Sequence, residues 1–172
     1  FKQKTAYEIK ECDWEFRRVL FRSPLWTELQ GYIYGPGMDR VQPFPGVVDF
    51  IAAAGAKGAE VMIVSHRSRR PYLGPPHDLH ASARGWLARH LGAILAVDRQ
   101  VHLAETKADK IARIRDLAFD WFIDDLPEFL GEADFPRDVR AILFDPTDAM
   151  PVPRPDVVRA PSWHAVRTMV FP

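Results

Sequence analysis

The sequence of 172 residues is poor in cysteine, has no net charge and contains no long apolar run. The single cysteine, Cys12, excludes a disulfide framework and a cysteine-ligated metal site, and it favours a reducing, cytoplasmic compartment. Lys plus Arg and Asp plus Glu number 23 each, so charge indicates neither a nucleic-acid nor a membrane partner. No apolar stretch reaches the length of a membrane-spanning helix. These absences leave a globular domain with a sizeable core.

Residues 1–23 differ from the rest of the chain, because they show no helical or strand period and contain the only cysteine. The segment resembles translated sequencing-adapter read-through, a contaminant at the ends of proteins predicted from metagenomic assemblies. We therefore exclude it from fold reasoning. A genuine N-terminal arm is the alternative. The expectation is one partial domain over residues 24–172, in a protein shortened at its N-terminus.

The remaining chain alternates strand and helix patterns. Apolar runs typical of buried strands occur at 61–64, 101–103, 121–123 and 141–144. Helical patterns occur at 45–55, 78–91, 106–118, near 127–130 and after 162. Residues 24–45 hold glycines among aromatics and are expected to form a loop, with one helical turn at most. This alternation predicts an α/β fold with a mainly parallel sheet.

Two adjacent carboxylates, Asp124 and Asp125, end the run that starts at Trp121. Acids at the end of a buried strand need hydrogen bonds or a cation, and parallel sheets bind ligands at the carboxyl ends of their strands. The pattern therefore indicates a Mg²⁺ site at this pair. The alternative is that Asp124 caps a helix beginning at Pro127 and that Asp125 is solvated.

A lysine occurs at the start of the next candidate element, in the capping-box-like sequence Thr106–Asp109. On a helical projection, Lys107 lies at the centre of the apolar stripe, and Lys110 lies roughly 60° away. This phase predicts that Lys107 points toward the strand ends and Lys110 toward solvent. The stripe consists of Ile111, Ile114 and Ala118.

Three features now follow one another: an apolar strand ending at Ser65 in VMIVSHR, Lys107 in ETKADKI, and the acid pair in WFIDDLP. Over residues 43–145 this order resembles the haloacid dehalogenase (HAD) superfamily of phosphohydrolases. The resemblance implies a Rossmann-like three-layer sandwich that binds Mg²⁺ and a phosphorylated substrate. It implies that Ser65 bonds the phosphoryl oxygens and that Lys107 neutralises charge, with Lys110 a weaker candidate. Substrate contacts are expected from Ser65, His66 and Arg67, and metal contacts from Asp124 and Asp125.

The first motif of that family is missing. It is an apolar strand ending in Asp-x-Asp, which supplies the nucleophile and the general acid/base, and the sequence contains no such triplet. Asp13 precedes Trp14-Glu15 but does not end an apolar strand. We therefore expect a domain that lacks its first, central strand and is inactive as it stands.

Two hypotheses for function remain open. The first is a Mg²⁺-dependent phosphohydrolase that hydrolyses phosphomonoesters through an aspartyl-phosphate. About 40 residues separate Ser65 from Lys107, too few for a cap domain, so a partner or oligomer could act as the lid. The second is a non-catalytic HAD-like module that binds a phosphorylated ligand or protein partner. A response-regulator receiver domain has its acids first and its lysine last, so the order here argues against it.

Overall fold

A computed structural model describes residues 23–172, and every strand pair in this part of the chain is parallel. Strands β1 (Ile63–His66) and β2 (Val101–Ala104) form one sheet. Strands β3 (Trp121–Asp124), β4 (Arg140–Phe144) and β5 (Val157–Ala160) form a second, in that order. The predicted α/β class and parallel pairing are confirmed at this level. The expected single sheet is not formed, because the described strands pair in two separate groups.

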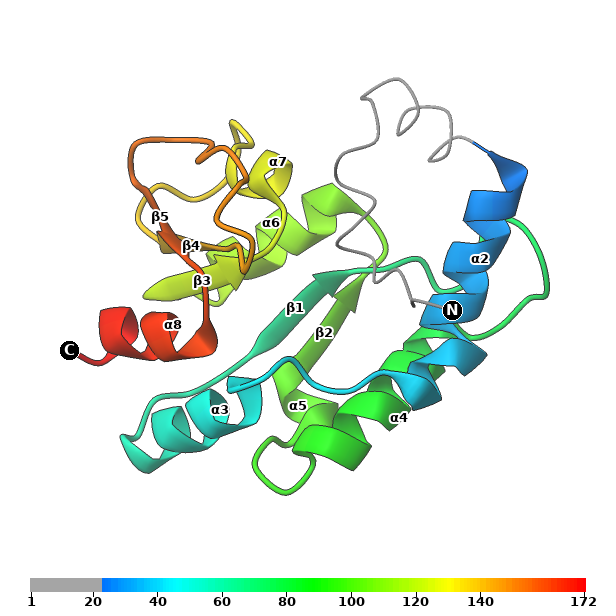
Figure 1. The fold of residues 1–172 in the computed structure, drawn as a ribbon, viewed down its shortest axis with the longest axis horizontal. Coiled ribbons are helices and arrows are strands. Elements are labelled where there is room, and N and C mark those ends of the chain that lie inside the picture. The colour runs from blue at the N-terminus through cyan, green and yellow to red at the C-terminus, as the bar shows by residue number, and fades with distance from the viewer. Residues whose placement is uncertain (1–22) are drawn as a thin grey trace, which may run out of the picture.

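Helices lie between all consecutive strands except β4 and β5, and they lie on both sides of the strands (Figure 1). Before β1 come α2 (Pro24–Tyr34), the 3₁₀ helix η2 (Pro36–Arg40) and α3 (Val47–Ala56). The later helices are α4 (Leu79–Leu91), α5 (Val97–Gln100), α6 (Lys107–Asp116), α7 (Pro127–Leu130) and α8 (Trp163–Val170). Within residues 23–172, no helix is both long enough and apolar enough to cross a membrane. Residues 1–22, nearly all of the segment expected to be foreign, lie outside this description.

Strand β4 separates two hydrophobic clusters, because its side chains alternate between the faces of the sheet. Ala141 and Leu143 pack in a cluster that includes residues of α6 and α7. Ile142 and Phe144 pack in a second cluster that includes residues of α3, α4 and α8. Helices thus cover both faces, which is why the strand is a continuous apolar run in the sequence.

Strands β1 and β3 are edge strands of the two sheets. Each strand has one pairing partner in the described structure, and each is buried at one of its four positions. Strand β4, paired on both sides, is buried at four of five. Val64 of β1 and Phe122 of β3 still share one cluster with Ile111 and Ile114 of α6. The two sheets therefore pack on the same helix through β1 and β3, each of which has a single pairing partner.

Residues 24–34 form a helix, so the prediction of a loop there is wrong. Ser23, which the sequence placed in the foreign segment, accepts a hydrogen bond from the Trp26 amide at 3.1 Å, and Pro24 occupies the first helical position. A side chain at Gly31 would place its Cβ 2.8 Å from Pro71 Cβ. This close approach fixes α2 against the loop that follows β1.

The second difference from the sequence expectation is β5, which lies in the stretch expected to be an irregular proline-rich tail. The strand is four residues long, with Val157 and Ala160 buried and the two positions between them more open. Its register pairs Ala160 with Phe144 of β4. A run this short, next to prolines, is too weak a pattern to separate from a loop.

Candidate functional site

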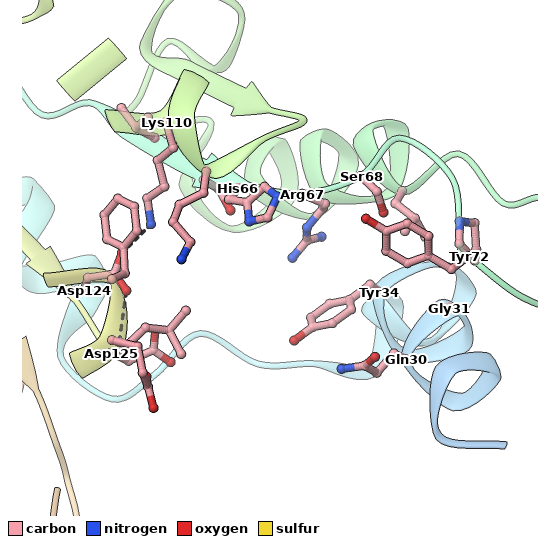
Figure 2. Close-up of a pocket in the computed structure, with 18 of the residues that line it drawn as sticks. Gln30, Gly31, Tyr34, His66, Arg67, Ser68, Tyr72, Lys110, Asp124 and Asp125 are labelled. Carbon is pink, nitrogen blue, oxygen red and sulfur yellow. Dashed lines mark hydrogen bonds and ion pairs between the residues drawn. The ribbon is translucent and has the colours of Figure 1, made fainter. Parts of the chain in front are cut away.

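A cavity of about 580 Å³ opens between the carboxyl ends of β1 and β3 on one side and α2 on the other (Figure 2). Two edge strands that end at the same place bring side chains from distant parts of the sequence together. Every site residue inferred from the sequence lines this cavity, and so does Lys110. These residues are Ser65, His66, Arg67, Lys107, Asp124 and Asp125.

Asp124 is held at the end of β3 by two contacts. One carboxylate oxygen accepts a hydrogen bond from the Leu126 amide at 3.0 Å, in a turn typical of aspartate. The other lies 2.5 Å from Lys110 Nζ. Leu126 is the N-cap residue of α7 and makes no side-chain cap. The alternative in which Asp124 caps that helix is therefore correct only in part. One oxygen of Asp124 accepts from the amide just before Pro127, and the other pairs with Lys110.

The lysine that reaches the strand ends is Lys110, so the predicted orientation of the two lysines is wrong. The side chain of Lys110 is 7% exposed, whereas that of Lys107 is 51% exposed and pairs with Glu132. The buried face of α6 consists of Lys110, Ile111 and Ile114. Lys107 still lines the cavity, but from the first position of the helix and next to solvent.

The surroundings of Lys110 explain how an ammonium group can be buried. Its Nζ lies 3.8 Å from the centroid of the Phe129 ring and 5.4 Å from that of Phe122. The electron-rich faces of these rings attract the cation, and the carboxylate of Asp124 supplies the opposite charge. The pair is therefore shielded from water and ordered, which fixes the direction of Asp124 toward the cavity.

Asp125 carries a less compensated charge. Loss of hydration in the cavity wall, followed by repulsion from Asp124, raises the pKa of the Asp125 carboxyl. The pKa would fall again if a cation came close to both carboxylates. The two carboxylates therefore favour binding of a cation, and the repulsion between them is a reason for this preference that the sequence does not reveal.

In metal-free protein at neutral pH, Asp125→Asn is expected to raise stability slightly. A folded-state pKa above the unfolded value gives stability that is complete below the unfolded pKa and lost as pH rises through the folded pKa. Removing the charge should recover on the order of 0.5 kcal/mol, because solvent screens a side chain open to the cavity. Urea unfolding in EDTA measures this change in the free energy of unfolding. The control is Asp120→Asn, at the other end of β3. A destabilised Asp125→Asn variant would contradict the repulsion described above.

Ser65 and His66 stand at the end of β1 by strand pairing. The register aligns Ser65 with Leu103 and His66 with Ala104 of β2. Ser65 is half-buried in the cavity wall, whereas His66 is exposed and places Nε2 3.2 Å from the Glu105 carbonyl oxygen. The strand extends one residue beyond the predicted end at Ser65, so the serine hydroxyl belongs to a paired residue with a fixed direction.

The far wall of the cavity was missed by sequence reasoning. It is made by α2, through Gln30 and Tyr34, and by Tyr72 of the loop after β1 (Figure 2). The available signal was Ser23-Pro24, a capping residue followed by proline at the first helical position. It was discarded because Ser23 was assigned to the segment excluded from fold reasoning.

The acid pair fits the oxygen chemistry of Mg²⁺. This ion is commonly held by one or two carboxylates and completes its shell with waters and substrate phosphate oxygens. Asp124 and Asp125 supply two carboxylates at the cavity wall. No cluster of three or more His, Cys, Asp or Glu able to hold a metal occurs among residues 23–172. The pair therefore suits an ion that shares its ligands with solvent and substrate.

No family model matches the chain, and the comparisons with curated proteins and with solved structures gave no significant match. Function must therefore be argued from the residues and their geometry.

Proposed function

We propose that this chain is part of a Mg²⁺-dependent phosphohydrolase of the HAD type. The observation that carries the proposal is that Ser65, Lys110 and the pair Asp124 and Asp125 line one cavity at the carboxyl ends of two parallel strands. A hydroxyl, an ammonium group and two carboxylates are the groups that a phosphoryl group and its metal ion require. These residues are more than 40 positions apart at the extremes, so only the fold brings them together.

In this proposal each side chain has one task. Ser65 donates a hydrogen bond to a phosphoryl oxygen, and Lys110 fixes Asp124 while adding positive charge beside it. Lys107, at the solvent side, steers the anionic substrate. Asp124 and Asp125 would hold Mg²⁺, which supplies Lewis-acid stabilisation of the transferring group when bound. The lysine role thus moves from Lys107 to Lys110, since Lys110 is the one beside the acid pair.

The proposal extends to a Rossmann-like three-layer sandwich that a further strand completes. Strands β1 and β3 each have one partner, pack on the same helix and end at the same cavity. A parallel strand between them would pair with both and would deliver its last residues to the cavity. An Asp-x-Asp at that end would provide the nucleophile, which no residue of the described cavity supplies. We therefore expect residues 1–172 alone to be inactive as a phosphatase.

A second candidate is a non-catalytic module that binds a phosphorylated ligand or protein partner. The absence of an Asp-x-Asp triplet favours it only if residues 1–23 belong to the native protein. Both candidates predict binding of a phosphate analogue, and they differ only in whether a longer form of the protein turns it over. The open cavity also leaves room for a partner or oligomer as the lid.

The expected result for the chain of residues 1–172 is Mg²⁺-dependent binding of methylphosphonate without hydrolysis of an aryl phosphate. Calorimetric titration with and without Mg²⁺ measures the binding. Asp125→Asn should weaken it at least about tenfold, because one charged ligand contact is worth on the order of 1.5–3 kcal/mol. Asp120→Asn should leave it unchanged. Equal binding with and without Mg²⁺ would contradict the proposal.

Hydrolysis separates the two candidates. The native gene product should contain an apolar strand ending in Asp-x-Asp and should release phosphate from the aryl ester. Activity should be lost when the first of those aspartates is changed to Asn. A full-length gene that begins with the present residues 1–23 and encodes no such strand would leave the binding module as the better description. Mg²⁺-dependent hydrolysis by residues 1–172, lost on changing Asp13, would show that the nucleophile lies there instead.

A further inference from the structure

Among the positively charged side chains of the described cavity wall, Arg67 differs because no acidic residue pairs with it. Lys110 pairs with Asp124 and Lys107 pairs with Glu132. Arg67 has neither an ion pair nor a side-chain hydrogen bond in residues 23–172, and its Nη1 is buried without a partner. A buried guanidinium nitrogen that bonds nothing is unfavourable, and an anionic ligand in the cavity would satisfy it.

The backbone of Arg67 is held from two directions. Its amide donates to the Ala104 carbonyl oxygen at 2.8 Å, which continues the pairing of β1 with β2. Its carbonyl oxygen lies 2.7 Å from Nε2 of His80 in α4. The residue is therefore fixed by a strand and a helix. A site on rigid elements needs little reorganisation to bind.

The guanidinium group faces the aromatic wall of the cavity. Its carbon lies 4.7 Å from the centroid of the Tyr34 ring, and Figure 2 shows Arg67 beside Tyr34 and across the cavity from the acid pair, with Gln30 beside the tyrosine. Burial lowers the pKa of Arg67, and within residues 23–172 no ion pair compensates for the loss of its hydration. Stacking covers one face of the planar group and leaves its edge for hydrogen bonds.

We propose that Arg67, backed by Tyr34, is a second anion-binding subsite, and that the ligand of this cavity carries an oxyanion in addition to its phosphoryl group. The proposal rests on the proposed function for the first anion only. Ser65 and the acid pair with its metal hold the phosphoryl group, and the fork of Arg67 binds a carboxylate or a second phosphoryl group. The substrate class is thus a phosphomonoester with a second negative charge, rather than a neutral sugar or alcohol phosphate.

The test uses non-hydrolysable ligands and the chain of residues 1–172. Methylphosphonate carries one anion, whereas phosphonoacetate, phosphonopropionate and phosphonobutyrate add a carboxylate at increasing distance. Bisphosphonates of matched length tell a second phosphoryl group from a carboxylate. Arg67→Gln removes the subsite. Arg70→Gln removes the same charge three residues away, outside the cavity lining, and is the control.

The best of the two-anion ligands should bind at least about tenfold more tightly than methylphosphonate, the effect of one charged hydrogen-bonded contact. Arg67→Gln should remove that advantage while changing methylphosphonate affinity much less and without lowering the melting temperature, and Arg70→Gln should alter neither affinity. Tighter binding that depends on Arg67 but not on Mg²⁺ would support the subsite while contradicting the proposed phosphoryl site. The subsite is overturned if two-anion ligands gain nothing, if their advantage survives in Arg67→Gln, if Arg67→Gln weakens methylphosphonate equally, or if no ligand binds.

Discussion

Lys110→Met is expected to lower the free energy of unfolding by roughly 3–5 kcal/mol, the usual effect of removing one partner of a buried ion pair. The side chains of Lys110 and Asp124 are 7% and 9% exposed, and their charged atoms lie 2.5 Å apart. Methionine fills a similar volume and keeps the contacts with Phe122 and Phe129 apolar. The loss therefore comes from the carboxylate of Asp124, which would remain buried with one hydrogen bond from the Leu126 amide. Urea unfolding at neutral pH without Mg²⁺ measures it.

Lys107→Met is the matched control, on the same helix and also with an acidic partner. Its pair with Glu132 is half exposed, so its loss should change stability by less than about 1 kcal/mol. The double variant Lys110→Met/Asp124→Leu should be more stable than Lys110→Met, because it removes both charges. If Lys107→Met lowered the free energy of unfolding more than Lys110→Met, the assignment of Lys110 to the buried face of α6 would be wrong.

The variants Lys110→Met and Lys107→Met also test which lysine contributes to catalysis in an active form of the proposed enzyme. Loss of one preorganised charge at a transferring phosphoryl group lowers kcat on the order of 10²–10³-fold. The position of Lys110 beside Asp124 assigns that effect to Lys110, whereas the helical projection of the sequence assigned it to Lys107. Because Lys110→Met also destabilises the fold, kcat must be compared at a temperature where both variants are folded.

The error in the lysine assignment has a physical origin. The projection uses only the angle around the helix axis, and by angle Lys107 lies at the centre of the stripe whether or not Ala118 is counted. The helix ends at Asp116, and Ala118 has φ of 47°, so it lies beyond the end of the helix in a left-handed turn. Lys107 is the first residue of the helix, and helical side chains tilt toward the N-terminus, so its side chain extends past the buried face. Lys110 lies nearly one turn further in, where its side chain is buried with Ile111 and Ile114. An apolar pattern cannot reveal a buried cation, because burial of Lys110 depends on Asp124 and Phe129, which are distant in sequence.

Strong local patterns predicted most of the elements that position the candidate site. The strands at Val64, Phe122 and Leu143 and the acid pair after β3 follow from apolar runs with clear ends. The helix α2, which forms the far wall of the cavity, could not be predicted in this way, because Gly31 interrupts the helical pattern and glycine weakens a helix. Gly31 is needed for the contact with Pro71, which no local rule encodes. Tertiary contacts of this kind overrode the local preference.

Asp145 directly follows the apolar run 141–144 in the sequence, and in the structure its side chain is a buried connection between backbone segments. It follows β4, is fully buried and accepts four hydrogen bonds. One oxygen accepts from the amide and hydroxyl of Thr147, and the other from the amides of Ala149 and Met150. Nε of Arg159 lies 3.8 Å away. The carboxylate therefore organises the turn between β4 and β5.

Asp145→Asn is expected to lower the free energy of unfolding by roughly 2–4 kcal/mol, because a buried donor left without an acceptor costs about 1–3 kcal/mol and a charged contact is also lost. Asparagine has one acceptor oxygen, and its NH₂ group must face one of the two donor pairs in either orientation. Asp148→Asn is the control, since the Asp148 side chain is 73% exposed and its loss should change stability by less than about 1 kcal/mol. Urea unfolding at neutral pH compares them.

The same residue predicts how the protein responds to acid. Burial alone would raise the pKa of Asp145, but the hydrogen bonds from Thr147, Met150 and Ala149 outweigh it and lower the pKa from 3.8 to about 2. A depressed carboxyl pKa gives stability that is complete above the unfolded value and lost as pH falls through the folded value. The wild-type protein should therefore lose stability between about pH 4 and pH 2, and Asp145→Asn should lose less over that range. Parallel curves for the two proteins in urea titrations across this interval would show that other carboxyl groups dominate acid unfolding.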